Sequence, residues 1–171
     1  GDISKWDTRK VDGTECMFEK ALFNGDLSRW DLRSVVNMQH MFAQSQFNGD
    51  ISSWNVSNVR TMEHMFDGSQ FNGCLANWDV SKVGYFACMF QNSPFSGDVS
   101  RWNTKSALEM NAMFAQTPNF NSPLSGWDVS QVISIEEMFK ESAFAQDISH
   151  WKLPSNASTI DLHKNNPRFI Q

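Results

Sequence analysis

A 24-residue repeat constrains this chain more than any other feature of its sequence. Successive tryptophans are 24, 24, 24, 24, 25 and 24 residues apart. A fixed period of this size is typical of repeat proteins, in which one copy cannot bury its apolar side without its neighbours. We therefore expect a solenoid of about seven ~24-residue coils. The repeat places the tryptophans at Trp6, Trp30, Trp54, Trp78, Trp102, Trp127 and Trp151.

A Met-Phe pair follows each of the first six tryptophans with the same period. Stacked coils bring equivalent residues into columns, and aromatic columns are typical of a core. The one 25-residue gap results from an insertion between Phe114 and Phe120, which we expect to lie in a turn and to leave the core in register. Besides the tryptophans, the predicted core consists of Phe18, Phe42, Phe66, Phe90, Phe114 and Phe139.

The pattern within one copy predicts a strand, a turn and a helix. In Phe47–Phe66, FNGDISSWNVSNVRTMEHMF, the Asn48-Gly49 pair indicates a turn and Asp50–Ser52 alternates polar and apolar residues as a short strand does. Ser57 stands where a helix N-cap is expected, and apolar residues then follow at steps of three and four. We therefore expect an α/β coil with a short strand and a short helix.

The two ends of the chain depart from this pattern. The chain opens at Gly1 halfway through a copy, so we expect it to begin inside a longer array. After Trp151 no further Met-Phe pair occurs. We expect one domain with a repeat solenoid over 1–151 and a C-terminal cap or exit segment over 152–171, because a solenoid needs a polar end.

Composition excludes several classes of function. The net charge of −5 argues against a surface that neutralises phosphates, so we expect no nucleic-acid partner. No apolar run approaches the roughly 20 residues of a membrane span. Cys occurs three times, so no disulfide framework can be claimed. No catalytic or phosphate-binding motif is found, and a repeat gives its carboxylates nearly equal environments, so we expect neither an enzyme nor a cofactor.

Polar columns also recur with the repeat. One column consists of Asn residues such as Asn48. It predicts a ladder in which each Asn side chain hydrogen-bonds the backbone of the neighbouring coil. Two Asp/Asn columns, one at Asp50 and one at Asn55, either cap turns through their side chains or bind Ca²⁺. The interchange of Asn and Asp in the second column favours turn capping.

One column combines residue types that bind zinc. The residues before the first four Met-Phe pairs are Cys16, His40, His64 and Cys88. Cys and His are ligands that zinc selects. The outer two would be about 14 Å apart at the ~4.8 Å strand spacing, so one ion cannot bind all four. The alternatives are a metal shared by His40 and His64, or a column of half-buried spacer residues.

The repeats resemble a known family. Phe47–Phe66, with the copies FNGDLSRWDLRSVVNMQHMF at Phe23–Phe42 and FSGDVSRWNTKSALEMNAMF at Phe95–Phe114, is similar to the BspA-like surface-protein repeat. The resemblance covers Gly1 to about Trp151. It implies a right-handed, leucine-rich-repeat-like α/β solenoid, a location at the cell surface or outside the cell, and adhesion or binding to another protein. The family has no shared catalytic motif.

Three functions follow as hypotheses. The first is a non-enzymatic protein-binding or adhesion scaffold, whose partner contacts residues that differ between copies. The second is a structural or linker subunit wedged in a larger assembly, for example a membrane or photosynthetic complex. The third is a carbohydrate-binding module, which requires exposed Trp rings. The copy-specific residues predicted to bind a partner are Arg9, Arg33, Arg60, Tyr85, Arg101, Lys105 and His150.

Overall fold

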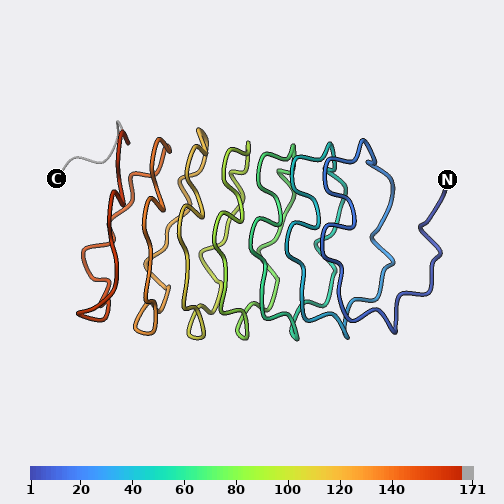
Figure 1. Cartoon of the computed structure of the whole chain (residues 1–171), viewed down its shortest axis with the longest axis horizontal. Helices are drawn as coiled ribbons and strands as arrows, with labels where there is room; N and C mark the ends of the chain where they lie inside the picture. Colours follow the sequence, from blue (N-terminus) through green and yellow to red (C-terminus); the bar gives the residue numbers. More distant parts are fainter. Residues whose placement is uncertain (167–171) are drawn as a thin grey trace.

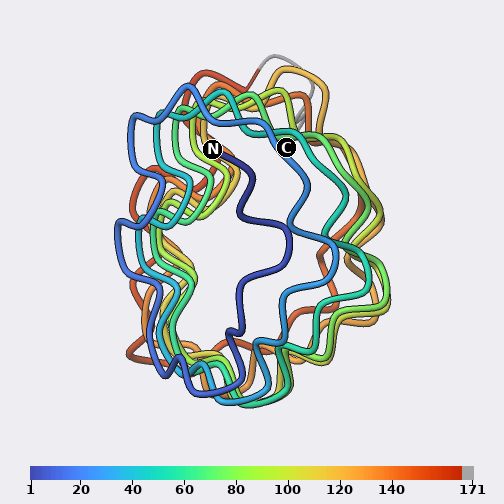
Figure 2. The same cartoon turned by 90° about the vertical axis from the view of Figure 1, so that its right-hand side faces the viewer.

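The chain forms a row of successive coils whose two ends lie at opposite ends of the row (Figure 1). The computed structural model describes residues 1–166. Viewed along the row, the coils overlie one another around a common axis (Figure 2). Parallel bridges join residues one repeat apart, at Gly13–Asn37, Asn37–Thr61, Thr61–Tyr85, Tyr85–Glu109, Glu109–Ser134 and Ser134–Ser158.

The predicted α/β coil, with a strand and a helix in each leucine-rich-repeat-like unit, is wrong. Residues 1–166 contain no helix and no strand longer than an isolated bridge residue. Each coil is built from turns instead, and hydrogen bonds along the row hold the coils together.

Consecutive turns replace the expected helix. Main-chain bonds close the turns Met62–Met65, His64–Asp67 and Phe66–Ser69 at 3.2, 3.2 and 3.1 Å. The intervening N–H groups of His64 and Phe66 donate to carbonyls of the next coil, both at 2.9 Å. Since alternate donors point along the row, they cannot make the i to i−4 bonds of an α-helix. His64 has a φ of 54°, the left-handed value required at the third position of a type II turn.

The expected strand at Asp50–Ser52 is also a turn. The carboxylate of Asp50 accepts the N–H of Ser52 at 2.9 Å, and Trp54 N–H bonds to the carbonyl of Ile51 at 3.1 Å. The extended residue of this coil is Thr61, further along the chain. The prediction of a strand at Asp50–Ser52 is therefore wrong, and the bridge of this coil lies at Thr61 instead.

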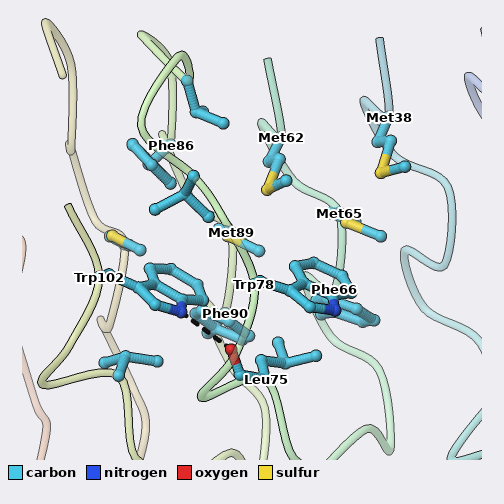
Figure 3. Close-up of a cluster of buried hydrophobic side chains, with 14 of the residues drawn as sticks. Met38, Met62, Met65, Phe66, Leu75, Trp78, Phe86, Met89, Phe90 and Trp102 are labelled. Carbon is cyan, nitrogen blue, oxygen red and sulfur yellow. Dashed lines mark hydrogen bonds between the residues drawn. The ribbon is translucent and has the colours of Figure 1, made fainter. Parts of the chain in front are cut away.

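Aromatic and sulfur-containing columns fill the interior (Figure 3). The rings of Phe42 and Phe66 are parallel to within 5° and 5.7 Å apart, and Phe42 also contacts Phe47 at 4.2 Å. The inserted residue before Phe120 leaves this arrangement intact, because Phe95 and Phe120 are 6.2 Å apart. All six predicted core phenylalanines are buried.

The tryptophans form their own column. Each indole N–H from Trp30 onward donates to a carbonyl of the preceding coil, as Trp102 does to Leu75 at 3.0 Å (Figure 3). The column is not buried throughout. Trp6 in the first coil is 60% exposed, contrary to its prediction as core, and Trp151 is only partly buried. A buried indole needs both a packed ring and an acceptor, and the coil arrangement supplies them for the interior tryptophans.

The segment after Trp151 continues the row as far as it is described. Ser158 bridges to Ser134, and the ring of His163 stacks on Phe139 at 5.6 Å, in the position that Phe occupies in earlier coils. The last five residues of the predicted cap over 152–171, residues 167–171, lie outside the described part of the chain.

Candidate protein-binding face

The bridging residues and their neighbours form one outward face, which we call the bridge face. Main-chain bonds cross it from coil to coil, such as Arg60 N–H to Val36 carbonyl at 2.8 Å and Gly84 N–H to Arg60 carbonyl at 2.9 Å. These bonds fix the spacing of the side chains along the row. The face consists of Val36, Asn37, Gln39, Arg60, Thr61, Glu63, Gly84, Tyr85, Ala87, Leu108, Glu109, Asn111, Ile133, Ser134 and Glu136.

Apolar side chains are exposed on the bridge face. Val36, Tyr85 and Ile133 are 45%, 39% and 47% exposed, and half-buried Leu108 lies beside Gly84. Sequence reasoning selected Tyr85 but missed the other apolar residues. The available signal was the column Val36, Arg60, Gly84, Leu108 and Ile133, which mixes aliphatic residues with Arg and Gly although the core columns scarcely change.

Polar side chains on the same face bond to one another across coils. Gln39 donates to the carboxylate of Glu63, which also accepts from Thr61 at 3.1 Å. Asn111 accepts the hydroxyl of Ser134 and the N–H of Glu136. This ladder holds polar groups in place between the exposed apolar residues, so the face is ordered and chemically mixed.

The seven residues predicted to bind a partner are all exposed, but they do not form one cluster. Arg60 and Tyr85 lie in neighbouring columns of the bridge face. The guanidinium of Arg9 pairs with Asp7 at 2.7 Å and lowers the pKa of that carboxyl to about 2. Arg33, equivalent to Arg9, pairs in the same way with Asp31, while the remaining three, Lys105, Arg101 and His150, occur outside the bridge face.

The acidic columns cap turns. Asp50 and its equivalents Asp2, Asp26, Asp98 and Asp147 accept the N–H of the serine two residues on. Hydrogen bonds from the side chain and the main chain of that serine lower the pKa of each carboxyl. The column at Asn55 does the same, with Asn55 accepting Ser57 N–H at 3.1 Å. These bonds confirm the turn-capping prediction.

The predicted asparagine ladder is confirmed. The side-chain oxygen of Asn24 accepts Asn48 N–H at 2.8 Å, and Asn48 in turn accepts Asn72 N–H at 2.8 Å. Asn72 continues the ladder by accepting Ser96 N–H. The exposed corner of the coils is thereby tied together by side chains where no main-chain bridge occurs.

The Cys and His column has a geometry unlike that of a metal centre. The rings of His40 and His64 stack at 4.5 Å with an angle of 5°, so their nitrogens do not converge. His64 Nδ1 bonds to Asp67 at 3.0 Å. Within residues 1–166 no three His, Cys, Asp or Glu side chains are grouped so as to hold a metal ion.

A row of near-identical coils with one copy-specific, ordered face defines a repeat protein. The family described as "Mycoplasma protein of unknown function, DUF285" matches residues 1–94 and again residues 68–171, and the chain belongs to this family. The two overlapping matches agree with the internal repetition. No curated protein and no solved structure matches the chain. Among residues 1–166, no helix has the length and apolar character needed to cross a membrane.

Proposed function

We propose that the chain is a non-enzymatic protein-binding scaffold of the BspA-like surface-repeat type, and that a partner protein docks on the bridge face. The observation that carries this proposal is the exposure of Val36, Tyr85 and Ile133 on a face whose backbone is fixed by hydrogen bonds. Exposed apolar and aromatic residues within a polar surround are typical of the centres of protein interfaces.

Rigidity supports the same function. The side chains of the bridge face project from a backbone that is bonded to both neighbouring coils, as at Arg60, whose N–H donates to Val36 and whose carbonyl accepts from Gly84. Such a face loses little conformational entropy on binding. Its residues differ between copies, so an array of this kind can vary its specificity while its core stays the same. A location at the cell surface belongs to this proposal through the resemblance to BspA-like repeats.

Binding to immobilised extracellular-matrix and cell-surface proteins tests the proposal. A double variant, Tyr85→Ser with Ile133→Ser, removes the apolar centre of the bridge face without touching the core. Arg101→Ser with His150→Ser is the matched control, because both residues are exposed in another column. The proposal predicts at least a tenfold weaker affinity for the first variant alone. Equal affinities of both variants, or no binding to any surface protein, would contradict it.

The second candidate is a subunit wedged in a larger assembly. It is favoured by Leu22, an apolar side chain that is 86% exposed. Sedimentation of the isolated chain separates the two candidates. A monomer at micromolar concentration favours the scaffold, whereas self-association that is abolished by Leu22→Ser favours the wedged subunit.

A carbohydrate-binding module has less support. Trp30, Trp54, Trp78, Trp102 and Trp127 are at most 4% exposed, so their rings offer no platform for a sugar. Trp151 does border a hollow of about 280 Å³, which Asp128, His150 and Lys152 also line.

A further inference from the structure

The negative net charge of the chain lies on the side of the coils that carries the bridge face. The stretches of chain on this side, which we call the bridge-side segments, are residues 12–22, 36–46, 60–70, 84–94, 108–119, 133–143 and 157–166. They contain ten Asp and Glu residues but only four Lys and Arg residues. The rest of residues 1–166 contains nine of each, so its charges balance. The negative net charge therefore comes from the bridge-side segments.

Three carboxylates of the bridge face point away from the core. Glu63, Glu109 and Glu136 are partly exposed. Their chain neighbours Met62 and Met110 are fully buried, and Met62 lies in the interior cluster of Figure 3. Successive side chains of an extended segment point to opposite sides. The buried neighbours therefore place the glutamates on the outer surface.

Neutral groups bond to these carboxylates. Glu63 accepts from Gln39 and Thr61, and Glu136 accepts the hydroxyl of Ser158. None of the three glutamates forms an ion pair with another of residues 1–166. Outside the bridge-side segments, by contrast, two aspartates are paired with arginines at 2.7 Å. The bridge face therefore presents negative charge that no cation of the described chain neutralises at contact distance.

The three carboxylates are close enough for their fields to overlap. Glu63 and Glu136 are three coils apart, about 14 Å at the ~4.8 Å spacing of the bridges, and Glu109 lies in the neighbouring column between them. The Debye length is about 10 Å at an ionic strength of 0.1 M, so salt screens their fields only in part. Arg60 is the one cation of the bridge face, and its guanidinium forms no ion pair within residues 1–166.

Exposed apolar groups lie among these carboxylates. Glu109 is bridged to Tyr85 in the coil before it and to Ser134 in the coil after it, and Ser134 follows the exposed Ile133. A surface that mixes apolar groups with unneutralised carboxylates is complementary to one that mixes apolar groups with Lys or Arg.

We propose that the partner docking on the bridge face presents a basic, amphipathic segment of protein. Its Lys or Arg side chains meet Glu63, Glu109 and Glu136, while its apolar side chains cover Tyr85 and Ile133. This inference rests on the proposed function, because it names the chemistry of the partner for the same face. Complementary charge speeds the association of such a segment and selects against acidic surfaces.

Fluorescence anisotropy tests the inference with a labelled peptide of Lys-Leu-Ser repeats and a Glu-Leu-Ser peptide of the same length. We expect the full chain to bind the Lys peptide at least about tenfold more tightly, by a margin that shrinks as salt is added. Combining Glu63→Gln, Glu109→Gln and Glu136→Gln should weaken binding of the Lys peptide by about tenfold, because Gln keeps an acceptor oxygen but has no charge. Arg60→Ser should strengthen it by about twofold.

The matched control removes three carboxylates outside the bridge-side segments. Asp31→Asn, Asp79→Asn and Asp128→Asn together change the net charge by the same amount. Their column already contains Asn55 and Asn103, and Asn55 caps its turn by accepting Ser57 N–H at 3.1 Å, so the control keeps its turn caps. Its affinity for the Lys peptide should stay within about twofold of the wild type.

Equal affinity of the wild type for the two peptides would overturn the inference, and this comparison needs no variant to fold. Equal affinities of the two triple variants for the Lys peptide would overturn it as well. Tyr85→Ser with Ile133→Ser separates this failure from that of the proposed function. If this variant loses the Lys peptide and the glutamine variant keeps it, the charge inference fails and the docking face stands. If neither variant weakens binding, docking on the bridge face fails too.

Discussion

The indole Nε1 of Trp78 donates to the main-chain carbonyl of Ile51, 27 residues earlier, at 3.1 Å. The same bond recurs in the neighbouring coils, so one side chain both fills the core and gives a buried carbonyl of the preceding coil a second hydrogen-bond donor. This double role explains why Trp, and not another aromatic residue, stands at this position in every copy.

Replacing this tryptophan should be costly. Trp78→Phe keeps an aromatic ring but removes one of the two donors to the Ile51 carbonyl, which still accepts Trp54 N–H, and opens a small cavity, so we expect a loss of about 1–3 kcal/mol in the free energy of unfolding. Urea denaturation measures the loss. The control is Trp6→Phe, which should change stability by less than about 1 kcal/mol because Trp6 is 60% exposed. Equal losses at the two positions would show that the hydrogen bond and the burial do not matter.

The asparagine ladder makes a separate contribution. Asn48→Ala removes the acceptor of Asn72 N–H, which is 2.8 Å away, and should lower the stability by about 0.5–1.5 kcal/mol. Asn48→Asp keeps an acceptor oxygen at the same place. It should therefore be less destabilising than the alanine variant in the same urea titration, and the reverse order would refute the role assigned to the ladder.

Left-handed backbone at non-glycine residues offers a stabilising change. Gln44 has a φ of 54°, whereas Gly68, the equivalent residue of the next coil, adopts 64° without steric cost. Gln44→Gly should relieve about 1–2 kcal/mol of strain, less the added entropy of an unfolded glycine, for a net gain of up to about 1 kcal/mol. The measurement is the midpoint of thermal unfolding.

Gln46→Gly is the matched control for this change. Gln46 is also exposed but its φ is not left-handed, so the same substitution should cost about 0.5–1 kcal/mol. The prediction is that Gln44→Gly has a higher midpoint of thermal unfolding than Gln46→Gly. If Gln44→Gly unfolds at the lower temperature, the strain at this position is not what limits stability.

The period and several polar columns were predictable from the sequence because they depend on residue identity at fixed spacing. The turns in place of helices were not. Apolar residues at steps of three and four, such as Val59, Met62 and Met65, are inward-facing in either structure. The left-handed residue of the turn is His64 in one coil and Cys88 in the next, and neither is the glycine that would indicate such a turn in a sequence. Hydrogen bonds to the next coil impose the left-handed conformation instead. For the same reason the sequence placed His40 and His64 in one column but did not show that Asp67 bonds to the ring of His64.

Acid should destabilise the last described coil through His163. Its ring stacks on Phe139, and burial lowers its pKa from 6.5 to about 4. In the unfolded chain His163 takes up a proton near pH 6.5, whereas in the folded chain it stays neutral until about pH 4. The unfolded state therefore binds more protons in this window, and the stability falls as the pH drops from 6.5 to 4.

The variant His163→Phe continues the phenylalanine column and removes this titration. Carboxylates of the capped turns, whose pKa values are also lowered, destabilise both proteins alike in acid, so the difference between wild type and variant isolates the histidine. Urea unfolding at pH 7, 5.5 and 4 should show the variant gaining in stability over the wild type as the pH falls. A difference that stays constant across these three values would mean that His163 is as readily protonated in the folded chain as in the unfolded one.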